Sequence, residues 1–165
     1  MKKNLKAGIL AASALLSLGL LAGCGSTAST AAQSTTSTTT VYQQYMSDVH
    51  AIVDSISVQS TALAKAVKAQ DSVAANAALG EIDTLVASLD KVSTPSALAE
   101  VQQDYKDGCT KLSSALRDYS DYYFGLQAAP EGDTSASDLQ LQNIQSTYEA
   151  GISALKAGDA LASSL

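Results

Sequence analysis

Apolar residues recur every three or four positions through most of this chain, and that spacing restricts its fold more than any other feature. Over residues 42–66 they fall on one helical face: Tyr42, Tyr45, Val49, Ile52, Ile56, Leu63 and Ala66, with Gln59 as the one polar member. A repeat near 3.6 residues puts such positions on one side of an α-helix, where they can be buried together. The spacing predicts a long amphipathic helix from Tyr42 to about Ala69.

The apolar pattern changes phase by two residues near Gln70. The next set of apolar positions is Ala75, Ala78, Ile82, Leu85, Leu89 and Val92. Asp71 and Ser72 are both residue types that cap helix N-termini. We therefore expect a tight turn at Gln70 and a second helix after it. Since neither Gly nor Pro marks this break, one continuous helix is the alternative.

Two further apolar stripes follow clearer boundaries. Thr94-Pro95 favours a helix start, because proline suits the first helical position and disfavours helix at the residue before it. The segment AAPEGDT, residues 128–134, is typical of a turn. The third stripe comprises Leu98, Val101, Tyr105, Gly108, Cys109, Leu112, Ala115, Leu116, Tyr119, Tyr122, Tyr123 and Leu126, and the fourth comprises Leu141, Ile144, Tyr148, Gly151, Ile152, Leu155, Gly158, Ala162 and Leu165.

Four amphipathic segments with short connections favour antiparallel neighbours. The sequence therefore predicts an all-α fold, an antiparallel up-down-up-down four-helix bundle over residues 41–165. Gly108, Gly151 and Gly158 lie on the apolar stripes, where a missing side chain lets helices approach or leaves room for an opposing tyrosine. We interpret them as packing devices, with a small internal cavity as the alternative.

Residues 25–40, GSTASTAAQSTTSTTT, contain no charged, aromatic or large aliphatic residue. Such a segment buries too little apolar surface to offset the entropy of ordering. We expect residues 24–40 to be a flexible tether, with a typical reach of about 20–25 Å. O-glycosylation of its hydroxyl residues is an alternative to a plain spacer.

The N-terminus has the features of an export signal. Lys2, Lys3 and Lys6 precede an uncharged apolar run from Ala7 to Leu21. The run is shorter than the roughly 20 apolar residues that span a bilayer. It ends in the sequence Leu21-Ala22-Gly23-Cys24.

This ending resembles the lipobox of bacterial lipoproteins and matches it at all four positions. The resemblance implies that residues 1–23 are a signal peptide, that the Cys24 thiol receives a diacylglyceryl group, and that Cys24 becomes the lipidated first residue. Acyl chains contribute about 0.8 kcal/mol per buried methylene, so two or more would hold the chain on the outer side of a cell membrane. In a cell with two membranes, an aspartate directly after the lipidated cysteine often signals inner-membrane retention. Here that position is Gly25. A secreted protein with a chance cysteine, or an uncleaved signal helix, are the alternatives.

Charge restricts the partners of the mature chain. The net charge is −6, and loss of residues 1–23 removes three basic residues and no acidic ones, giving −9. An acidic chain does not favour nucleic acid. The second cysteine, Cys109, lies on an apolar stripe, so we expect a small buried residue rather than a reactive thiol.

The sequence contains no recognisable pattern for catalysis, cofactor binding or metal binding. His50 is the only histidine, and neither a Gly-x-Ser-x-Gly motif, nor a glycine-rich phosphate loop, nor an EF-hand order of acids occurs. We expect His50 at the surface or boundary of the first helix. We expect no enzyme activity, no cofactor and no metal.

One local concentration of unusual residues remains, near the end of the third stripe. Tyr119, Asp121, Tyr122 and Tyr123 are followed across the turn by Asp133. Exposed, they form a candidate patch that stacks on sugar rings or attracts a cation. The alternative is that the tyrosines are core and the acids stabilise the next helix N-terminus.

The sequence leads to two functional hypotheses. The first is a non-enzymatic, membrane-anchored lipoprotein that binds an envelope protein or glycan, or serves as a structural accessory. The second is a receptor for a small ligand or cation with a pocket between helices, near the glycines on the apolar stripes.

Overall fold

The computed structural model describes residues 33–128 and 134–165, and this part of the chain is helical, without strands. Its long elements are α1 (Gln33–Ala69), α2 (Ser72–Ser88), α3 (Ala99–Ala128) and α4 (Thr134–Ala162). Two short 3-10 helices, η1 (Leu89–Lys91) and η2 (Ser96–Leu98), connect α2 to α3. The predicted all-α class is confirmed, and each of the four expected helices is present.

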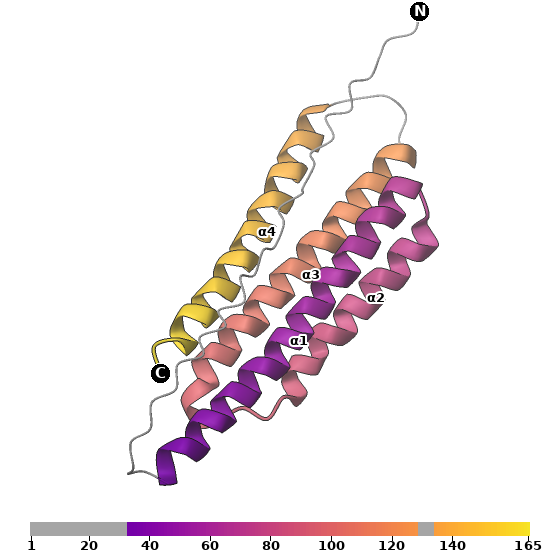
Figure 1. Ribbon diagram of the computed structural model, residues 1–165. Coiled ribbons are helices and arrows are strands. Elements are labelled where there is room, and N and C mark those ends of the chain that lie inside the picture. Colours follow the sequence, from indigo (N-terminus) through magenta and orange to yellow (C-terminus); the bar gives the residue numbers. More distant parts are fainter. Residues whose placement is uncertain (1–32, 129–133) are drawn as a thin grey trace, which may run out of the picture. The chain divides into compact units, whose positions relative to one another are not determined.

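The helices pack as two hairpins, α1 with α2 and α3 with α4, and α3 also contacts α1 and α2 (Figure 1). Figure 1 shows the α1–α2 turn and the last residues of α3 at one end of the helices, which we call the turn end. The start of α1 and the end of α4 lie at the other end. The last turns of α3 therefore lie far from the first residue of α1.

The α1–α2 turn forms where the apolar phase changes. Gln70 adopts the left-handed conformation with φ of 60°. Its N–H donates to the Val67 carbonyl at 3.0 Å, and the Asp71 N–H donates to the Ala66 carbonyl at 2.9 Å. These two bonds form a Schellman motif, which satisfies the last carbonyls of a helix. The Asp71 carboxylate then accepts from the Ala74 N–H at 2.9 Å and caps α2. The predicted turn is confirmed, and the continuous helix is excluded.

Helix α1 begins earlier than the apolar pattern indicates, at Gln33 instead of near Tyr42. Thr38, Thr39 and Thr40 are exposed, so burial does not explain this extension. Adding a residue to a formed helix gains one hydrogen bond without a new nucleation step, which allows weak helix formers to continue it. Within the expected tether, residues 33–40 are thus helical. Residues 24–32, including Cys24, and the signal segment 1–23 lie outside the described residues.

Most buried side chains form one group, which we call the main cluster. Its buried members come from all four long helices and both 3-10 helices: Tyr45, Val49, Val53, Ile56, Ile82, Leu89, Leu98, Val101, Tyr105, Cys109, Leu112 and Leu155. Tyr148, Ile152 and Leu161 of α4 pack against it while partly exposed. The main cluster is therefore the core that holds the two hairpins together.

A second group, the turn-end cluster, surrounds the α1–α2 turn. Its buried members are small or aliphatic residues of α1 and α2: Leu63, Ala66, Val67, Ala75, Ala78 and Leu79. Leu116, Tyr123 and Phe124 of α3 pack against it. Within the described residues, α4 supplies no member of this cluster. The turn-end cluster is thus built from residues of three helices.

Glycines set the close approach of α3 and α4. A Cβ added to Gly151 would lie 2.9 Å from Leu112 Cγ and 3.0 Å from the Gly108 carbonyl oxygen. A Cβ added to Gly158 would lie 3.1 Å from Cε2 of the Tyr105 ring. The structure thus confirms the interpretation of these glycines as packing devices, one of them opposite a tyrosine. Leucine and tyrosine side chains fill the space beside them.

Candidate functional site

The predicted aromatic residues occupy the last turns of α3, at the turn end. Tyr119 and Leu126 are 37% and 48% exposed, and Tyr122 is half-buried. Positions 119, 122 and 126 recur at intervals of three and four residues, so they form one continuous stripe along the helix. We call Tyr119, Tyr122, Leu126 and the acids Asp118 and Asp121 the α3-end surface.

The neighbouring rings connect this surface to the core. The centroids of the Tyr119 and Tyr123 rings are 6.5 Å apart, and those of Tyr123 and Phe124 are 5.7 Å apart in an edge-to-face arrangement. Tyr123 and Phe124 pack against the turn-end cluster. Burial, with a smaller contribution from Tyr123, raises the pKa of Tyr119 above its ordinary value. The ring of Tyr119 therefore lies beside the ring of Tyr123, which itself packs against the turn-end cluster.

The structure divides the predicted patch. Tyr119, Asp121 and Tyr122 lie within about one turn of α3 and retain exposed area, whereas Tyr123 belongs mainly to the core packing. Asp133 lies outside the described residues. The sequence left two interpretations, an exposed patch or core tyrosines. Tyr119 fits the first and Tyr123 fits the second.

Two acids give the α3-end surface its negative charge. Asp118 and Asp121 are exposed and form no ion pair within the described part of the chain. Arg117, the residue directly before Asp118, pairs with Asp83 of α2. From residue 118 to residue 155 the sequence supplies no basic residue. The negative charge of this surface is therefore uncompensated by its own helix.

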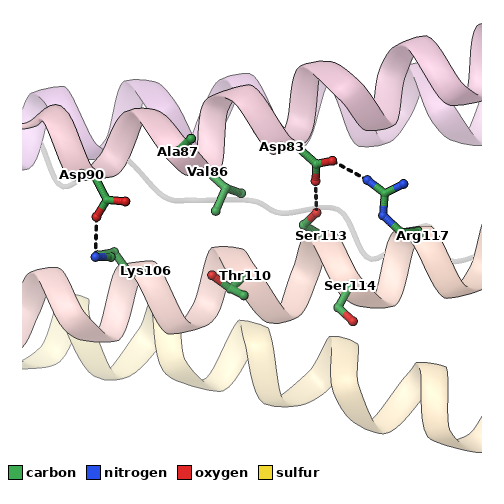
Figure 2. Close-up of a pocket in the computed structure, with 9 residues that line it drawn as sticks. All are labelled: Asp83, Val86, Ala87, Asp90, Lys106, Thr110, Ser113, Ser114 and Arg117. Atoms are coloured by element: carbon green, nitrogen blue, oxygen red, sulfur yellow. Dashed lines mark hydrogen bonds and ion pairs between the residues drawn. The ribbon is translucent and has the colours of Figure 1, made fainter.

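A second feature is an open groove of about 400 Å³ between α2 and α3 (Figure 2). Its lining residues are Asp83, Val86, Ala87, Asp90, Lys106, Thr110, Ser113, Ser114 and Arg117. Asp83 pairs with Arg117 and accepts from the Ser113 hydroxyl at 2.8 Å, and Asp90 pairs with Lys106. Every charged side chain in the groove thus has a partner across it. Such exposed pairs contribute about 0–1 kcal/mol each, and they join α2 to α3.

A third feature, which sequence reasoning missed, links α1, α3 and α4. Nε2 of His50 lies 3.0 Å from the Tyr105 hydroxyl and 3.1 Å from Oδ1 of Asp159. The Tyr105 hydroxyl donates to the same carboxylate oxygen. The sequence predicts that Tyr105 lies on the apolar stripe. It does not predict the contacts with His50 and Asp159, because both residues are more than fifty positions away. These contacts satisfy a buried phenol at the boundary of the main cluster.

Burial sets the chemistry of the phenol and thiol groups in the main cluster. It raises the pKa of Tyr105 far above its ordinary value, and the neighbouring Asp159 raises it further, so this phenol stays protonated. Burial also raises the pKa of Cys109 to about 12. The Cys109 side chain is fully buried, which confirms the expected filler role. A thiol in this state is a poor nucleophile, because the thiolate is the reactive form.

Tyr45 presents the opposite case from Tyr105. Its ring is buried in the main cluster, and its hydroxyl has no hydrogen-bond partner in the described part of the chain. Burial raises the pKa of Tyr45 to about 12, and the nearby Thr94 side chain, which does not reach hydrogen-bond geometry, offsets this only in part. The two buried tyrosines thus differ in whether their hydroxyl is satisfied.

The described residues form neither a metal site nor a membrane-spanning helix. Within residues 33–128 and 134–165, no group of three or more His, Cys, Asp or Glu side chains is placed to hold a metal ion. None of the helices in this part of the chain is long and apolar enough to cross a membrane. No protein-family model, no curated protein and no solved structure matches the chain.

Proposed function

We propose that this chain is a lipid-anchored, extracytoplasmic lipoprotein without enzyme activity, and that it binds an envelope protein or glycan through the α3-end surface. Cys24, within Leu21-Ala22-Gly23-Cys24, is the lipidated residue, and residues 1–23 are the cleaved signal. Residues 41–165 form the up-down-up-down bundle, and residues 24–40 connect it to the membrane. In a cell with two membranes, the outer membrane is an alternative location.

The observation that carries the binding role is the partly exposed stripe of Tyr119, Tyr122 and Leu126, beside acids that form no ion pair within the described residues. Exposed aromatic side chains combine a large apolar face with a polar tip, which suits recognition of proteins and sugars. The stripe lies at the turn end, away from the start of α1 (Figure 1). A chain anchored through residues that precede α1 presents this end toward partners beyond the membrane surface.

The second candidate function is a receptor for a small ligand or cation, and the groove of about 400 Å³ between α2 and α3 favours it. The groove is not beside the glycines of α3 and α4, where the sequence suggested a pocket. Its charged residues already pair with one another, so a charged ligand has to displace those contacts (Figure 2). We therefore rank this function below partner binding.

Two experiments test the main proposal. Labelling of bacterial cells with a radioactive fatty acid should mark the full-length protein, and Cys24→Ala should abolish the label. Separately, a photo-crosslinking residue at Tyr122 should capture a discrete envelope component, while the same residue at Val58, an exposed position of α1, should not. Labelling without Cys24 would contradict the anchor, and equal capture from both positions would contradict the binding surface.

A further inference from the structure

The α3-end surface places exposed carboxylates beside partly exposed tyrosine rings. Asp118 and Tyr122 are four residues apart and lie one above the other on the helix, as do Tyr122 and Leu126. Asp121 lies one turn from Asp118 on the other side of this line. An acidic edge therefore runs directly beside an aromatic and aliphatic stripe. Both the carboxylates and the rings keep exposed area.

The α3-end surface lacks the ion pairs that several other acids form with basic residues. Asp83, Asp90 and Asp107 each pair with a lysine or arginine of α3. No basic residue occurs from Asp118 to Leu155, so the last turns of α3 and most of α4 carry only negative charge. Asp138 and Glu149 of α4 are exposed as well. Like charges along one surface attract a cation from outside the chain.

We propose that the α3-end surface binds a short cationic segment of a protein partner, with lysine or arginine side chains placed over Tyr119 and Tyr122 and beside Asp118 and Asp121. This inference rests on the proposed function and specifies its partner. A cation over a tyrosine face is attracted to the ring, and a carboxylate at the ring edge adds an ion pair. A cationic segment would thus contact both the tyrosine rings and the carboxylates of this surface.

Charge complementarity distinguishes this occupant from the others. A second copy of the chain would bring its own acidic surface, since the mature chain carries a net charge of −9. A neutral glycan would stack on the tyrosines and leave the carboxylates without a role. Residues 118–126 span about 12 Å along the helix at 1.5 Å per residue. That length matches three or four residues of an extended segment, at roughly 3.3 Å per residue.

The test uses the full-length lipidated protein in nonionic detergent and fluorescein-labelled hexapeptides. The probes are an alternating arginine–leucine peptide, the corresponding glutamate–leucine peptide and the serine–leucine peptide, titrated by fluorescence anisotropy at low and high salt. We expect binding of the arginine peptide alone, weakened by salt because the contacts are ionic. Circular dichroism melts of each variant check that the fold is retained.

The decisive variant is the pair Asp118→Asn and Asp121→Asn, with Asp54→Asn and Glu81→Gln as the matched control. The control acids are exposed on α1 and α2 and remove the same charge. The first pair should weaken the arginine peptide about tenfold, since two exposed ion pairs together contribute roughly 1.4 kcal/mol. The control pair should change binding less than about twofold, because only its long-range charge is lost. Tyr122→Ala should weaken binding without altering its salt dependence.

The outcomes separate this inference from the proposed function. Equal loss in both charge-neutralised pairs, or equal binding of the serine and arginine peptides, overturns the cationic partner. In a further experiment, chitin or cell-wall oligosaccharides are added before crosslinking from position 122. If they reduce crosslinking, and reduce it equally in the protein with Asp118→Asn and Asp121→Asn, the partner is a glycan. That result overturns this inference and leaves the proposed function standing. If neither peptide nor oligosaccharide binds and Tyr122 captures nothing on cells, both are overturned.

Discussion

The main cluster and the turn-end cluster bury similar kinds of side chain, yet they differ in how completely they are enclosed. Four long helices surround the main cluster, and α4 closes it with Leu155, Tyr148 and Ile152. The turn-end cluster has α1, α2 and α3 around it, and no α4 residue among those described. Residues on the same stripe of α3 are therefore buried at one end and exposed at the other. Leu112 and Tyr119, seven positions apart, show the change.

This difference gives the two ends of α3 different roles: one end stabilises the fold, and the other is available for the proposed binding. At the main cluster, α3 uses its stripe to pack against its neighbours. At the turn end the same stripe is less completely buried and leaves Tyr119 and Leu126 available. Four pairs of substitutions test this contrast, in order of decreasing expected effect.

The largest effect should come from Leu155→Ala in α4. Leu155 is buried in the main cluster, so its truncation should lower the free energy of unfolding by about 2–5 kcal/mol through lost burial and a cavity. Leu139→Ala is the matched control on the same helix, because Leu139 is 64% exposed. Its effect should stay within about 0.5 kcal/mol. Urea denaturation measures both, and similar losses would mean that α4 is held along its whole length.

Gly151→Ala should be the next most damaging change. The new Cβ would meet Leu112 and the Gly108 carbonyl, so α3 and α4 must separate slightly. We expect a loss of about 1–2 kcal/mol, since overpacking outweighs the better helix propensity of alanine. Gly80→Ala in α2 is the control, because nothing lies within 4 Å of its added Cβ. That variant should gain about 1 kcal/mol. A gain in both would show that the glycines do not limit the helix spacing.

The two buried tyrosines of the main cluster should respond in opposite ways to loss of their hydroxyl. Tyr105→Phe removes the donor to Asp159 and the contact with His50, and should cost about 1 kcal/mol. Tyr45→Phe removes an unsatisfied buried hydroxyl, so it should be neutral or add up to about 1 kcal/mol. Thermal melts at neutral pH compare the pair. Equal destabilisation would indicate that the Tyr45 hydroxyl has a partner in solution.

Gln70→Gly should have the smallest effect and should act at the turn end. Gln70 is held at φ of 60°, a conformation that costs an ordinary residue roughly 1–2 kcal/mol and glycine nothing. The larger entropy of unfolded glycine opposes this by about 0.4–1 kcal/mol. The net gain should be about 0.5 kcal/mol in chemical denaturation. Gln70→Val, with a β-branched side chain, should be destabilising, and a loss on Gln70→Gly would contradict the role of the Schellman turn.

Local rules were sufficient for the helices and their breaks. The change of phase at Gln70 and the capping potential of Asp71 located a turn that neither glycine nor proline marks. The stripes contain most of the buried apolar residues but miss Val53, Val67 and Leu79, and the glycines on them were correctly assigned to close packing. The start of α1 was missed, because extension of a helix beyond its buried face depends on backbone hydrogen bonds and leaves no apolar pattern.

The candidate site was accessible to the sequence only in part. The cluster of tyrosines and acids near residue 120 stood out by composition, but its division into core and surface did not. Tyr119 and Tyr123 are one turn apart on the same helix, and periodicity assigns both to the apolar side. Whether each is covered depends on which side chains of the neighbouring helices pack against it.

By itself, the sequence determined that residues after about 40 form amphipathic helices, where they break, and which face of each is apolar. Those properties depend on the side chains within a few turns of each residue. Only the tertiary structure decided that His50 meets Tyr105 and Asp159, that Asp83 of α2 pairs with Arg117 of α3, and that the end of the α3 stripe keeps exposed area. These depend on which helices become neighbours and in what register, and one helix face can satisfy its periodicity against many partners.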